Sequence, residues 1–397
     1  MRSGSRRTSE LTPLLDGVTV LDLASVGPAA RASRWLADYG ATVVKVGPVP
    51  ARGGVQVVPV FFAYSAHRSM LRAQFDLKAP EGRDAFLRLA ESADVIIESF
   101  RPGVSDRLGI GYADVQARNP GIIYCSTTGF GQDGPHAQWA GHDLDYLAVG
   151  GYLDCTGRGA DGRPPIPGAT VADSAGGGMH AVMAILAALV GRASSGEGTY
   201  LDVSVADGVL ALMALQIDEY LATGAEPGPG HGILTGRYAC YDTYEAGDGK
   251  WLALGIIEGR FWTNLCDALD LGQWHDHQTD DAAQDAIRAD LRAAFATKPR
   301  DEWVDLLASA DTCVAPVLSV PELVDDEQFL ARGAFVSAEH PEHGVFHQVG
   351  PVLAGQTPAE GTYVVREVDI TDTDELLRAA GVSDDEYSRL VEAGVVA

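Results

Sequence analysis

The stretch that decides the fold is Val-Thr-Val-Leu-Asp-Leu-Ala-Ser-Val-Gly-Pro-Ala-Ala-Arg-Ala-Ser-Arg-Trp-Leu-Ala-Asp-Tyr-Gly-Ala-Thr-Val-Val-Lys-Val, residues 18–46. Its first six residues form a β-branched apolar run, which Gly27-Pro28 ends. Residues 29–39 then have helical spacing, Gly40 caps them, and residues 41–46 are a second apolar run. We predict a β-turn-α-β unit, which builds a parallel sheet. The turn lacks the GxGxxG pattern, so no dinucleotide fingerprint is predicted.

The same pattern continues along the chain. Further strands are predicted at 94–98, 122–126 and 200–205, and helices at 83–93, 179–190 and 206–222. The helix at 179–190 is apolar on nearly all sides, so we expect it to be buried. Ligands of open parallel sheets bind outside the carboxyl ends of the strands, so we expect Arg101 and the turn at 129–134 at the ligand edge.

Composition shifts suggest the domain boundaries. Residues 1–10 carry arginines without an apolar run and are expected to form a disordered leader. The first part of a large α/β domain spans 11–222, and the glycine- and proline-rich segment 223–232 is the predicted linker. A small domain follows at 233–330, with a strand at 251–255 and helices near 260–269, 281–296 and 300–309. Residues 331–397 return to the large domain. They are predicted to be polar and without regular structure, except for two short helices within 373–397.

Length and charge limit the classes of function. A chain of 397 residues can bury more than one core. Its net charge of −26 repels phosphate backbones, so we expect no nucleic-acid partner. The five cysteines form no CxxC pair, so neither a metal site nor a disulfide framework is predicted, and a cytoplasmic location is expected. No apolar run approaches the about 20 residues of a membrane span, so we expect no membrane partner.

Two polar residues beside glycines are the candidates for catalysis. His142 lies in Gly-His-Asp-Leu-Asp-Tyr, residues 141–146, and Asp173 precedes Ser174 and three glycines at the start of the apolar helix. Such a pair can act as proton carriers on one carbon. The glycines let a ligand approach the backbone, and the helix start offers N–H groups to a developing oxyanion. The structural alternatives are a surface or core histidine and an N-cap aspartate.

Charged residues elsewhere also have two interpretations. Glu258 ends an apolar strand, either as a solvated residue or as the group that orients and charges His142. Arginines bind phosphates through paired hydrogen bonds, and lysine acts as a point charge, but solvated surface charge is the alternative for each. The basic candidates are Arg68, Arg72, Lys78, Arg101 and Arg107.

Together these pieces resemble the family III coenzyme A transferases (CaiB/BaiF type), and within them the α-methylacyl-CoA racemases. The resemblance runs from Leu15-Asp16-Gly17 to the C-terminal tail. The matching stretches are Leu-Ala-Asp-Tyr-Gly-Ala at 36–41, Asp-Leu-Lys-Ala-Pro-Glu-Gly at 76–82, Phe-Arg-Pro-Gly-Val at 100–104, Arg-Leu-Gly at 107–109, Thr-Gly-Phe-Gly-Gln-Asp-Gly-Pro at 128–135 and Asp-Thr-Tyr at 242–244.

The resemblance implies roles for individual residues. His142 corresponds to the catalytic histidine of racemases, Asp173 to the catalytic aspartate and Glu258 to the glutamate that supports the histidine. In transferases the aspartate is instead an acylated nucleophile, and a glutamine often stands where this chain has Val26. The implied contacts to CoA are Arg52, Arg68, Arg72, Asp76, Leu77, Lys78, Ser99, Phe100, Arg101, Arg107, Gly141, Asp143, Leu144, Asp145 and Tyr146.

Two departures from the racemase pattern concern the phosphate contacts. Racemases usually carry an arginine shortly after the second strand, where this chain has Gly47-Pro48 and the nearest arginine is Arg52. The segment 47–75 is longer than in racemases and looks more like the transferase branch. Arg52, Arg68 or Arg72 is expected to replace the missing contact. In the histidine motif, Asp145 stands for a more usual asparagine.

The resemblance also implies the fold and the reaction. The expected fold is an interlocked homodimer, with a Rossmann-like large α/β domain built from both chain ends and a smaller α+β domain, the site lying between the two chains. The expected reaction is racemisation of 2-methyl-branched acyl-CoA thioesters, with no cofactor beyond the CoA of the substrate. The alternatives are a CoA transferase with Asp173 as nucleophile, an epimerase or isomerase of a specialised acyl-CoA, and a non-catalytic acyl-CoA-binding homologue.

Overall fold

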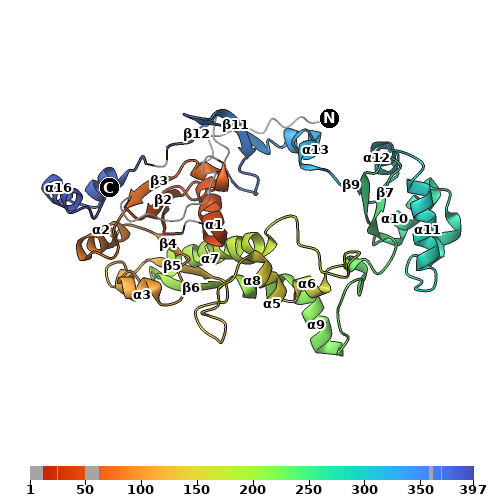
Figure 1. Cartoon of the computed structure of the whole chain (residues 1–397), viewed down its shortest axis with the longest axis horizontal. Helices are drawn as coiled ribbons and strands as arrows, with labels where there is room; N and C mark the ends of the chain where they lie inside the picture. Colours follow the sequence, from red (N-terminus) through yellow and green to blue (C-terminus); the bar gives the residue numbers. More distant parts are fainter. Residues whose placement is uncertain (1–11, 25, 50–61, 357–360, 368) are drawn as a thin grey trace. The chain divides into compact units, whose positions relative to one another are not determined.

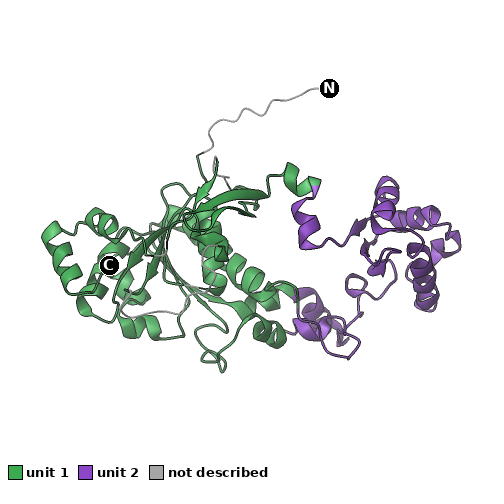
Figure 2. Ribbon diagram, turned by 45° about the horizontal axis from the view of Figure 1, so that its top comes forward, with its two compact units in different colours: residues 1–150, 167–212, 327–397 green, residues 151–166, 213–326 purple. Residues whose placement is uncertain are grey.

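The computed structural model describes residues 12–24, 26–49, 62–356, 361–367 and 369–397, and the predicted leader 1–10 lies outside them. The chain forms two compact units (Figure 2). The large unit holds residues up to Gly150, Pro167–Leu212 and Glu327–Ala397, and the small unit holds Gly151–Ile166 and Met213–Asp326. The boundary thus falls at Met213 rather than at residue 223, and the residues of the predicted linker belong to the small unit.

A six-stranded parallel sheet forms the centre of the large unit (Figure 1). Its strands are β1 Thr19–Asp22, β2 Thr42–Gly47, β3 Leu71–Gln74, β4 Val95–Glu98, β5 Ile123–Thr128 and β6 Thr199–Ser204. They lie in the order β3-β2-β1-β4-β5-β6, with Leu21 paired to Val44 on one side and to Ile96 on the other. This is the doubly wound Rossmann order, whose switch point lies between β1 and β4. The predicted α/β class is confirmed.

Alternation along the strands fills two cores, one on each face of the sheet. On β1, Val20 belongs to the core that packs against α1 Gly27–Asp38 and α7 His180–Ser195, and Leu21 belongs to the opposite core. The opposite core takes residues of α2 Pro80–Ala90 and the C-terminal Val396. Both ends of the chain therefore build the large unit, as predicted.

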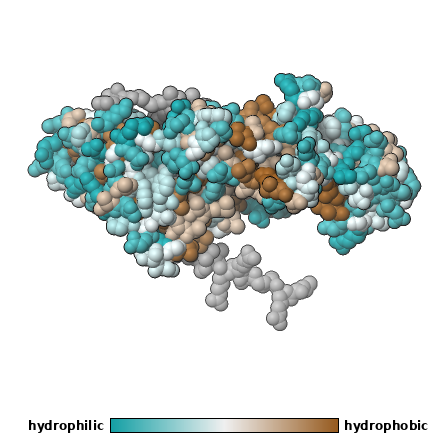
Figure 3. Space-filling view, turned by 90° about the horizontal axis from the view of Figure 1, so that it is seen from below, coloured by the Kyte–Doolittle hydropathy of each residue, from teal (hydrophilic) through white to brown (hydrophobic). Residues whose placement is uncertain are grey.

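Two predictions about the long apolar helices are wrong. Residues 206–222 form two helices, α8 Val205–Leu212 and α9 Ala214–Thr223, because the chain leaves helical geometry at Met213. Helix α7 is not fully buried: its outer face leaves Met183 64% and Val190 74% exposed. Figure 3 shows hydrophobic residues (brown) exposed among hydrophilic ones on one face of the molecule.

The segment 172–195 is continuous in the structure, because the π-helix η3 Ala172–Met179 leads directly into α7. By length and apolar composition alone these 24 residues could cross a membrane, a test that helices of protein cores also pass. Ala181 and Ile185 are buried in the core against β5. Shorter helices follow the strands: η2 Ala63–His67, α3 Val104–Leu108, α4 Tyr112–Gln116 and α5 Asp143–Val149.

The small unit is built on an antiparallel sheet of β7 Tyr241–Glu245, β8 Trp251–Gly255 and β9 Val314–Pro316. Its larger helices are α10 Gly259–Ala268, α11 Gln284–Phe295 and α12 Arg300–Ser309. The predicted strand and three helices are confirmed to within three residues at each end. Shorter elements are α6 Tyr152–Cys155, η4 Ile233–Thr235, η5 Gly272–His277 and α13 Val320–Val324. The core buries Trp262, Phe295 and Trp303.

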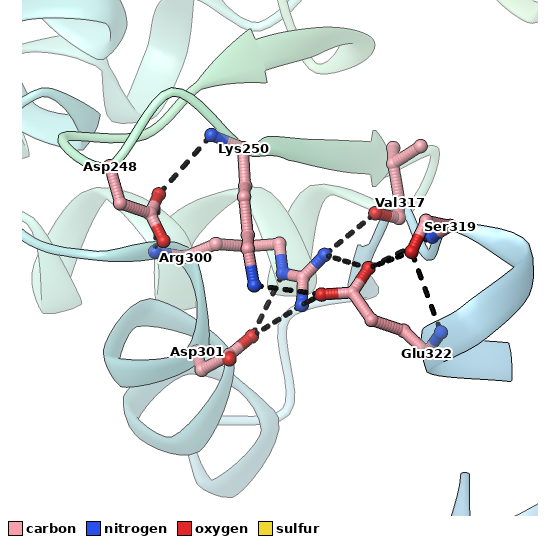
Figure 4. Close-up of polar contacts among 7 residues, drawn as sticks. All are labelled: Asp248, Lys250, Arg300, Asp301, Val317, Ser319 and Glu322. Carbon is pink, nitrogen blue, oxygen red and sulfur yellow. Dashed lines mark hydrogen bonds and ion pairs between the residues drawn. The ribbon is translucent and has the colours of Figure 1, made fainter. Parts of the chain in front are cut away.

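A polar network fastens α13 to the rest of the small unit (Figure 4). Arg300, which is buried at the start of α12, donates hydrogen bonds to Glu322 at 2.8 and 3.2 Å and to the carbonyl oxygen of Val317 at 2.8 Å. Glu322 also accepts from the Lys250 ammonium at 2.7 Å and from the Ser319 hydroxyl at 2.9 Å. Asp301 also lies 2.8 Å from Arg300, so two positive and two negative charges balance and the network stabilises the last helix of this unit.

After α14 Glu327–Ala331, the C-terminal segment contains more regular structure than predicted. A three-stranded sheet of β10 Phe335–His340, β11 Gly344–Val349 and β12 Tyr363–Val364 occupies a region predicted to be broken. The prediction failed because the third strand has only two residues and pairs with β10, a distant segment of the chain. The two final helices, α15 Thr373–Ala379 and α16 Asp384–Glu392, are confirmed.

Candidate active site

The π-helix η3 presents Asp173 as its second residue, so the alternative interpretation of Asp173 as an N-cap residue is wrong. The three glycines that follow are buried and serve helix packing instead of ligand approach. A Cβ atom on Gly177 would lie 2.5 Å from the Cβ of Pro28, and one on Gly178 would lie 2.8 Å from the ring of Trp35. Glycine is therefore required for α1 to pack directly on the π-helix. π-Helical turns are frequent at functional sites.

Two charged partners hold Asp173 in place. Its carboxylate oxygen Oδ2 lies 3.4 Å from Nη1 of Arg31 on α1, and its backbone N–H donates to Oδ1 of Asp143 at 2.9 Å. The N–H of Ser174 donates to the carbonyl oxygen of Thr170 at 3.0 Å. Both N–H groups are thus occupied, which corrects the prediction that they are free to bind an oxyanion.

His142 lies immediately before α5, with an exposed side chain. Its backbone N–H donates to Oδ2 of Asp145 at 2.9 Å, which caps the helix. Because α5 also carries Asp143, the hydrogen bond from Asp173 to Asp143 joins the two catalytic motifs across 30 residues of sequence. The structure therefore brings the segments that carry His142, Asp143 and Asp173 together, and the catalytic roles of these residues stay predictions.

Tyr146 supports the loop that carries His142. Its hydroxyl donates to the carbonyl oxygen of Gly141 at 2.6 Å, and its side chain is buried. A Cβ atom on Gly141 would lie 2.8 Å from the Tyr146 ring, and one on Gly129 would lie 2.4 Å from it. Gly141, Asp145 and Tyr146 thus shape the loop, and Leu144 is exposed. Their roles as CoA contacts stay predictions.

The electrostatics suit proton transfer at Asp173. Burial raises the pKa of its carboxyl group above the ordinary value, and the Asp143 carboxylate raises it further. The charges of Arg31 and His142 oppose this rise in pKa. Burial and the nearby carboxylates also raise the pKa of Tyr146 to about 12, so its hydroxyl stays protonated. A carboxyl group with a raised pKa beside a histidine can both accept and return a proton.

Arg68 is part of a buried structural network, and its predicted role at the CoA phosphates stays a prediction. Its side chain is 1% exposed and donates to both carboxylate oxygens of Asp38 at 3.1 and 3.2 Å. It also donates to the carbonyl oxygen of Val349 at 2.7 Å and lies 4.8 Å from the ring centroid of Tyr363. Arg34 shares Asp38 at 2.7 Å.

Arg72 is likewise held within the fold. Its guanidinium donates to the carbonyl oxygens of Arg366 and Glu367, and its backbone N–H donates to Oδ2 of Asp372 at 2.8 Å. These bonds tie β3 to the C-terminal segment, and the CoA contact of Arg72 stays a prediction. Arg52, the third candidate for the missing contact, lies outside the described residues.

Three predicted basic residues remain exposed near the ends of β3 and β4. Lys78, Arg101 and Arg107 are exposed, and none of their side chains forms an ion pair within the described residues. Their neighbours shape the turns: Asp76 is buried and accepts from the backbone N–H of Lys78, and Leu77 packs against the core. Ser99 is exposed. Both turns lie at the carboxyl edge of the sheet, where ligands bind.

Two residues of this edge were missed from sequence. Glu98 ends β4, is 2% exposed, and accepts the backbone N–H of Phe100 at 2.6 Å. Burial raises the pKa of its carboxyl group. Arg31 follows the turn after β1. The rule that pointed to Arg101, a polar residue at the end of a parallel strand, applies equally to Glu98 but not to Arg31, which lies within α1.

Glu258 belongs to the small unit, where it is exposed and immediately precedes α10. Its support of His142 stays a prediction. Across the described residues no cluster of histidine, cysteine and acidic side chains could hold a metal ion.

Comparisons with known proteins agree on one family. Residues 15–363 match the family model described as CoA-transferase family III. The human protein named alpha-methylacyl-CoA racemase is 32% identical over 95% of this chain and 96% of its own length. Succinate–glutarate CoA-transferase of Agrobacterium fabrum is 33% identical over 87% of this chain and 90% of its own. A crystal structure of a CAIB/BAIF family protein from Brucella suis matches with a TM-score of 0.74 at 29% identity, over 92% of this chain and 98% of its own.

Proposed function

Since the chain belongs to CoA-transferase family III, we propose that it racemises or epimerises 2-methyl-branched acyl-CoA thioesters by removing and returning the α-proton. The observation that carries the proposal is the hydrogen bond between the backbone of Asp173 and the side chain of Asp143. It holds the histidine motif and the aspartate motif together, as an acid–base pair acting on one carbon requires. The similarity to the human protein named a racemase supports the same reading.

In the proposed mechanism each member of the pair serves one face of the α-carbon. Neutral His142 takes the α-proton from one face, so the C–H electrons enter the thioester enolate. Protonated Asp173 then gives a proton to the other face, which inverts the centre. The opposite direction exchanges the two roles. The raised pKa of Asp173 supports this scheme, because the carboxyl group then holds a proton at higher pH than an ordinary aspartate does.

The rest of the machinery follows from the same proposal. The CoA phosphates bind the exposed cations at the ends of β3 and β4, and the reaction uses no cofactor beyond the CoA of the substrate. Glu258 orients His142, and the enzyme works as a homodimer. Arginine binds phosphate through paired charge-assisted hydrogen bonds, which favours Arg101 and Arg107 for this task.

Proton exchange tests the proposal directly. The protein is incubated with a 2-methylacyl-CoA in deuterated water without any acceptor acid, and the α-carbon is followed by mass spectrometry. We expect deuterium at this carbon with the wild type and none with His142→Ala or Asp173→Ala, while the fold persists in both. Full exchange by either variant would rule out the acid–base pair.

A second function, CoA transfer between carboxylic acids, is favoured by the contact between Arg31 and Asp173. A neighbouring guanidinium stabilises an ionised carboxylate, and an ionised Asp173 is the form that can attack a thioester. The similarity to the protein named succinate–glutarate CoA-transferase points the same way. This function predicts no exchange of the α-proton, transfer only when an acceptor acid is added, and an acyl-enzyme that hydroxylamine cleaves.

A further inference from the structure

Arg31 is a charged residue at the site that the acid–base scheme leaves without a task. It lies on the second turn of α1, and its guanidinium has contacts on two sides. Nη1 lies 3.4 Å from Oδ2 of Asp173, and Nη2 donates to the hydroxyl of Thr170 at 2.7 Å. The guanidinium carbon lies 5.4 Å from the ring centroid of Tyr64. The side chain is therefore oriented before any ligand binds.

Close packing of α1 on the π-helix brings this guanidinium to Asp173. A Cβ atom on Gly178 would lie 3.2 Å from the Cβ of Arg31, so the two backbones meet with no side chain between them. The hydroxyl of Tyr64 also accepts the backbone N–H of Gly27 at 2.9 Å, which fixes the start of α1. The glycines after Asp173 thus determine the distance between guanidinium and carboxylate.

The other groups that face Asp173 within the large unit come from α5. They are the Asp143 carboxylate, the His142 imidazole and the Tyr146 hydroxyl. Burial and Asp143 both favour the protonated form of Asp173, and Arg31 is the largest opposing influence. Without Arg31, His142 would be the remaining one of these groups that favours the ionised form of Asp173.

We propose that Arg31 is a positioning residue that keeps the Asp173 carboxylate partly ionised and turned toward α1, an inference that rests on the proposed function of Asp173. Two proton states of the pair then become accessible near neutral pH. In one, Asp173 is ionised and His142 carries the proton, and in the other the proton is on Asp173. A racemase needs both states, because each enantiomer is attacked from a different face.

The test measures the pH at which Asp173 ionises, with and without Arg31. A carbodiimide reacts with protonated carboxyl groups, so its coupling to Asp173 is followed against pH by peptide mass spectrometry, with the exposed Asp154 as internal reference. We expect the midpoint to rise by about 1–3 pH units in Arg31→Met, as is usual when an arginine neighbour is lost, and to return most of the way in Arg31→Lys. The acidic limb of kcat/KM for α-proton exchange is expected to move by the same amount.

Arg192→Met is the matched control. Arg192 has the same side-chain exposure as Arg31, 21%, and pairs with Asp94 at 2.7 Å in the same unit, so its loss should leave the midpoint of Asp173 in place. If Arg31→Met does not fold, Arg31→Gln replaces it. An unchanged midpoint in the folded variant overturns the inference. A shifted midpoint in a protein that exchanges no α-proton overturns the racemase function and leaves the effect of Arg31 on Asp173 standing.

Discussion

Replacing Asp38 with asparagine is expected to destabilise the large unit strongly. The Asp38 carboxylate is the shared partner of Arg34 at 2.7 Å and of Arg68 at 3.1 and 3.2 Å, and the three side chains are 5%, 7% and 1% exposed. Arginine does not give up its proton in proteins, so Asp38→Asn leaves two buried positive charges without a counter-charge. Breaking a buried ion pair in this way costs about 3–5 kcal/mol.

The two possible truncations of this network are not equivalent. Arg68→Met removes one of two positive charges and leaves Arg34 with Asp38, a balanced pair. The loss of stability in Arg68→Met comes mainly from the carbonyl oxygen of Val349, which loses the hydrogen bond that Arg68 donates at 2.7 Å. An unsatisfied buried acceptor costs about 1–3 kcal/mol. We therefore expect Asp38→Asn to be the less stable variant.

Urea unfolding followed by circular dichroism measures the difference. The control is Asp84→Asn, because Asp84 is 55% exposed and pairs with Arg118 on the surface, where an ion pair contributes about 1 kcal/mol or less. The expected order of stability is Asp84→Asn, then Arg68→Met, then Asp38→Asn. If Asp38→Asn is as stable as Asp84→Asn, the network is not the buried, charge-unbalanced cluster described above. If folded Arg68→Met raises KM for acyl-CoA, the residue binds the ligand after all.

Three further predictions concern the CoA edge and the small unit. Arg101→Met should raise KM for an acyl-CoA about 10- to 150-fold, by loss of charge-assisted hydrogen bonds of about 1.5–3 kcal/mol. It should leave KM unchanged for an N-acetylcysteamine thioester, which lacks the phosphates. The exposed Arg163→Met is the control, and an equal rise for both thioesters would show that Arg101 does not bind the phosphates. Glu98→Ala should likewise raise KM for the CoA ester alone, because the backbone N–H of Phe100 loses its acceptor. Glu98→Gln keeps an acceptor oxygen and should return KM to the wild-type value. A KM that stays raised in Glu98→Gln would exclude a role through this hydrogen bond. Bonds to Arg300 and Lys250 lower the pKa of Glu322, so the ionised carboxylate stabilises the fold above the ordinary glutamate pKa of 4.5, and this stabilisation is lost as pH falls below it. Glu322→Gln should therefore flatten the fall in urea midpoint between neutral and acid pH. An equally steep fall in the variant would contradict the role of Glu322 in this pH dependence.

The parallel sheet could be predicted from sequence because its signals are local. Each strand is a short run of β-branched or aliphatic residues, and helical spacing separates the first strands, so residues 18–46 already specify the unit that repeats. The catalytic candidates were also found locally, since a histidine or an aspartate beside glycines is visible within a few residues. The sheet at 335–364 escaped because its third strand, β12, has only two residues and pairs in parallel with β10, more than 20 residues earlier.

Errors arose where a partner lies far away in sequence. Nothing near Arg68 and Arg72 in sequence shows that Asp38, Val349 and Arg366 bind them within the fold. The glycines after Asp173 looked like a ligand-binding loop because the helix they pack against begins more than 140 residues earlier. Charge and backbone freedom are properties of a residue, but whether they serve a ligand or the fold is decided by long-range contacts.

The same distinction bears on the choice between the two chemistries of this family. His142 and Asp173 can be found by motif, yet the motif does not say how much of Asp173 is ionised. That fraction depends on the burial of Asp173 and on the charges of Asp143 and Arg31, and these three residues are far apart in sequence. A mostly protonated Asp173 is suited to return a proton, and a mostly ionised one is suited to attack a thioester. Under the two functions proposed above, the balance between burial and Arg31 is what would separate racemase from transferase activity.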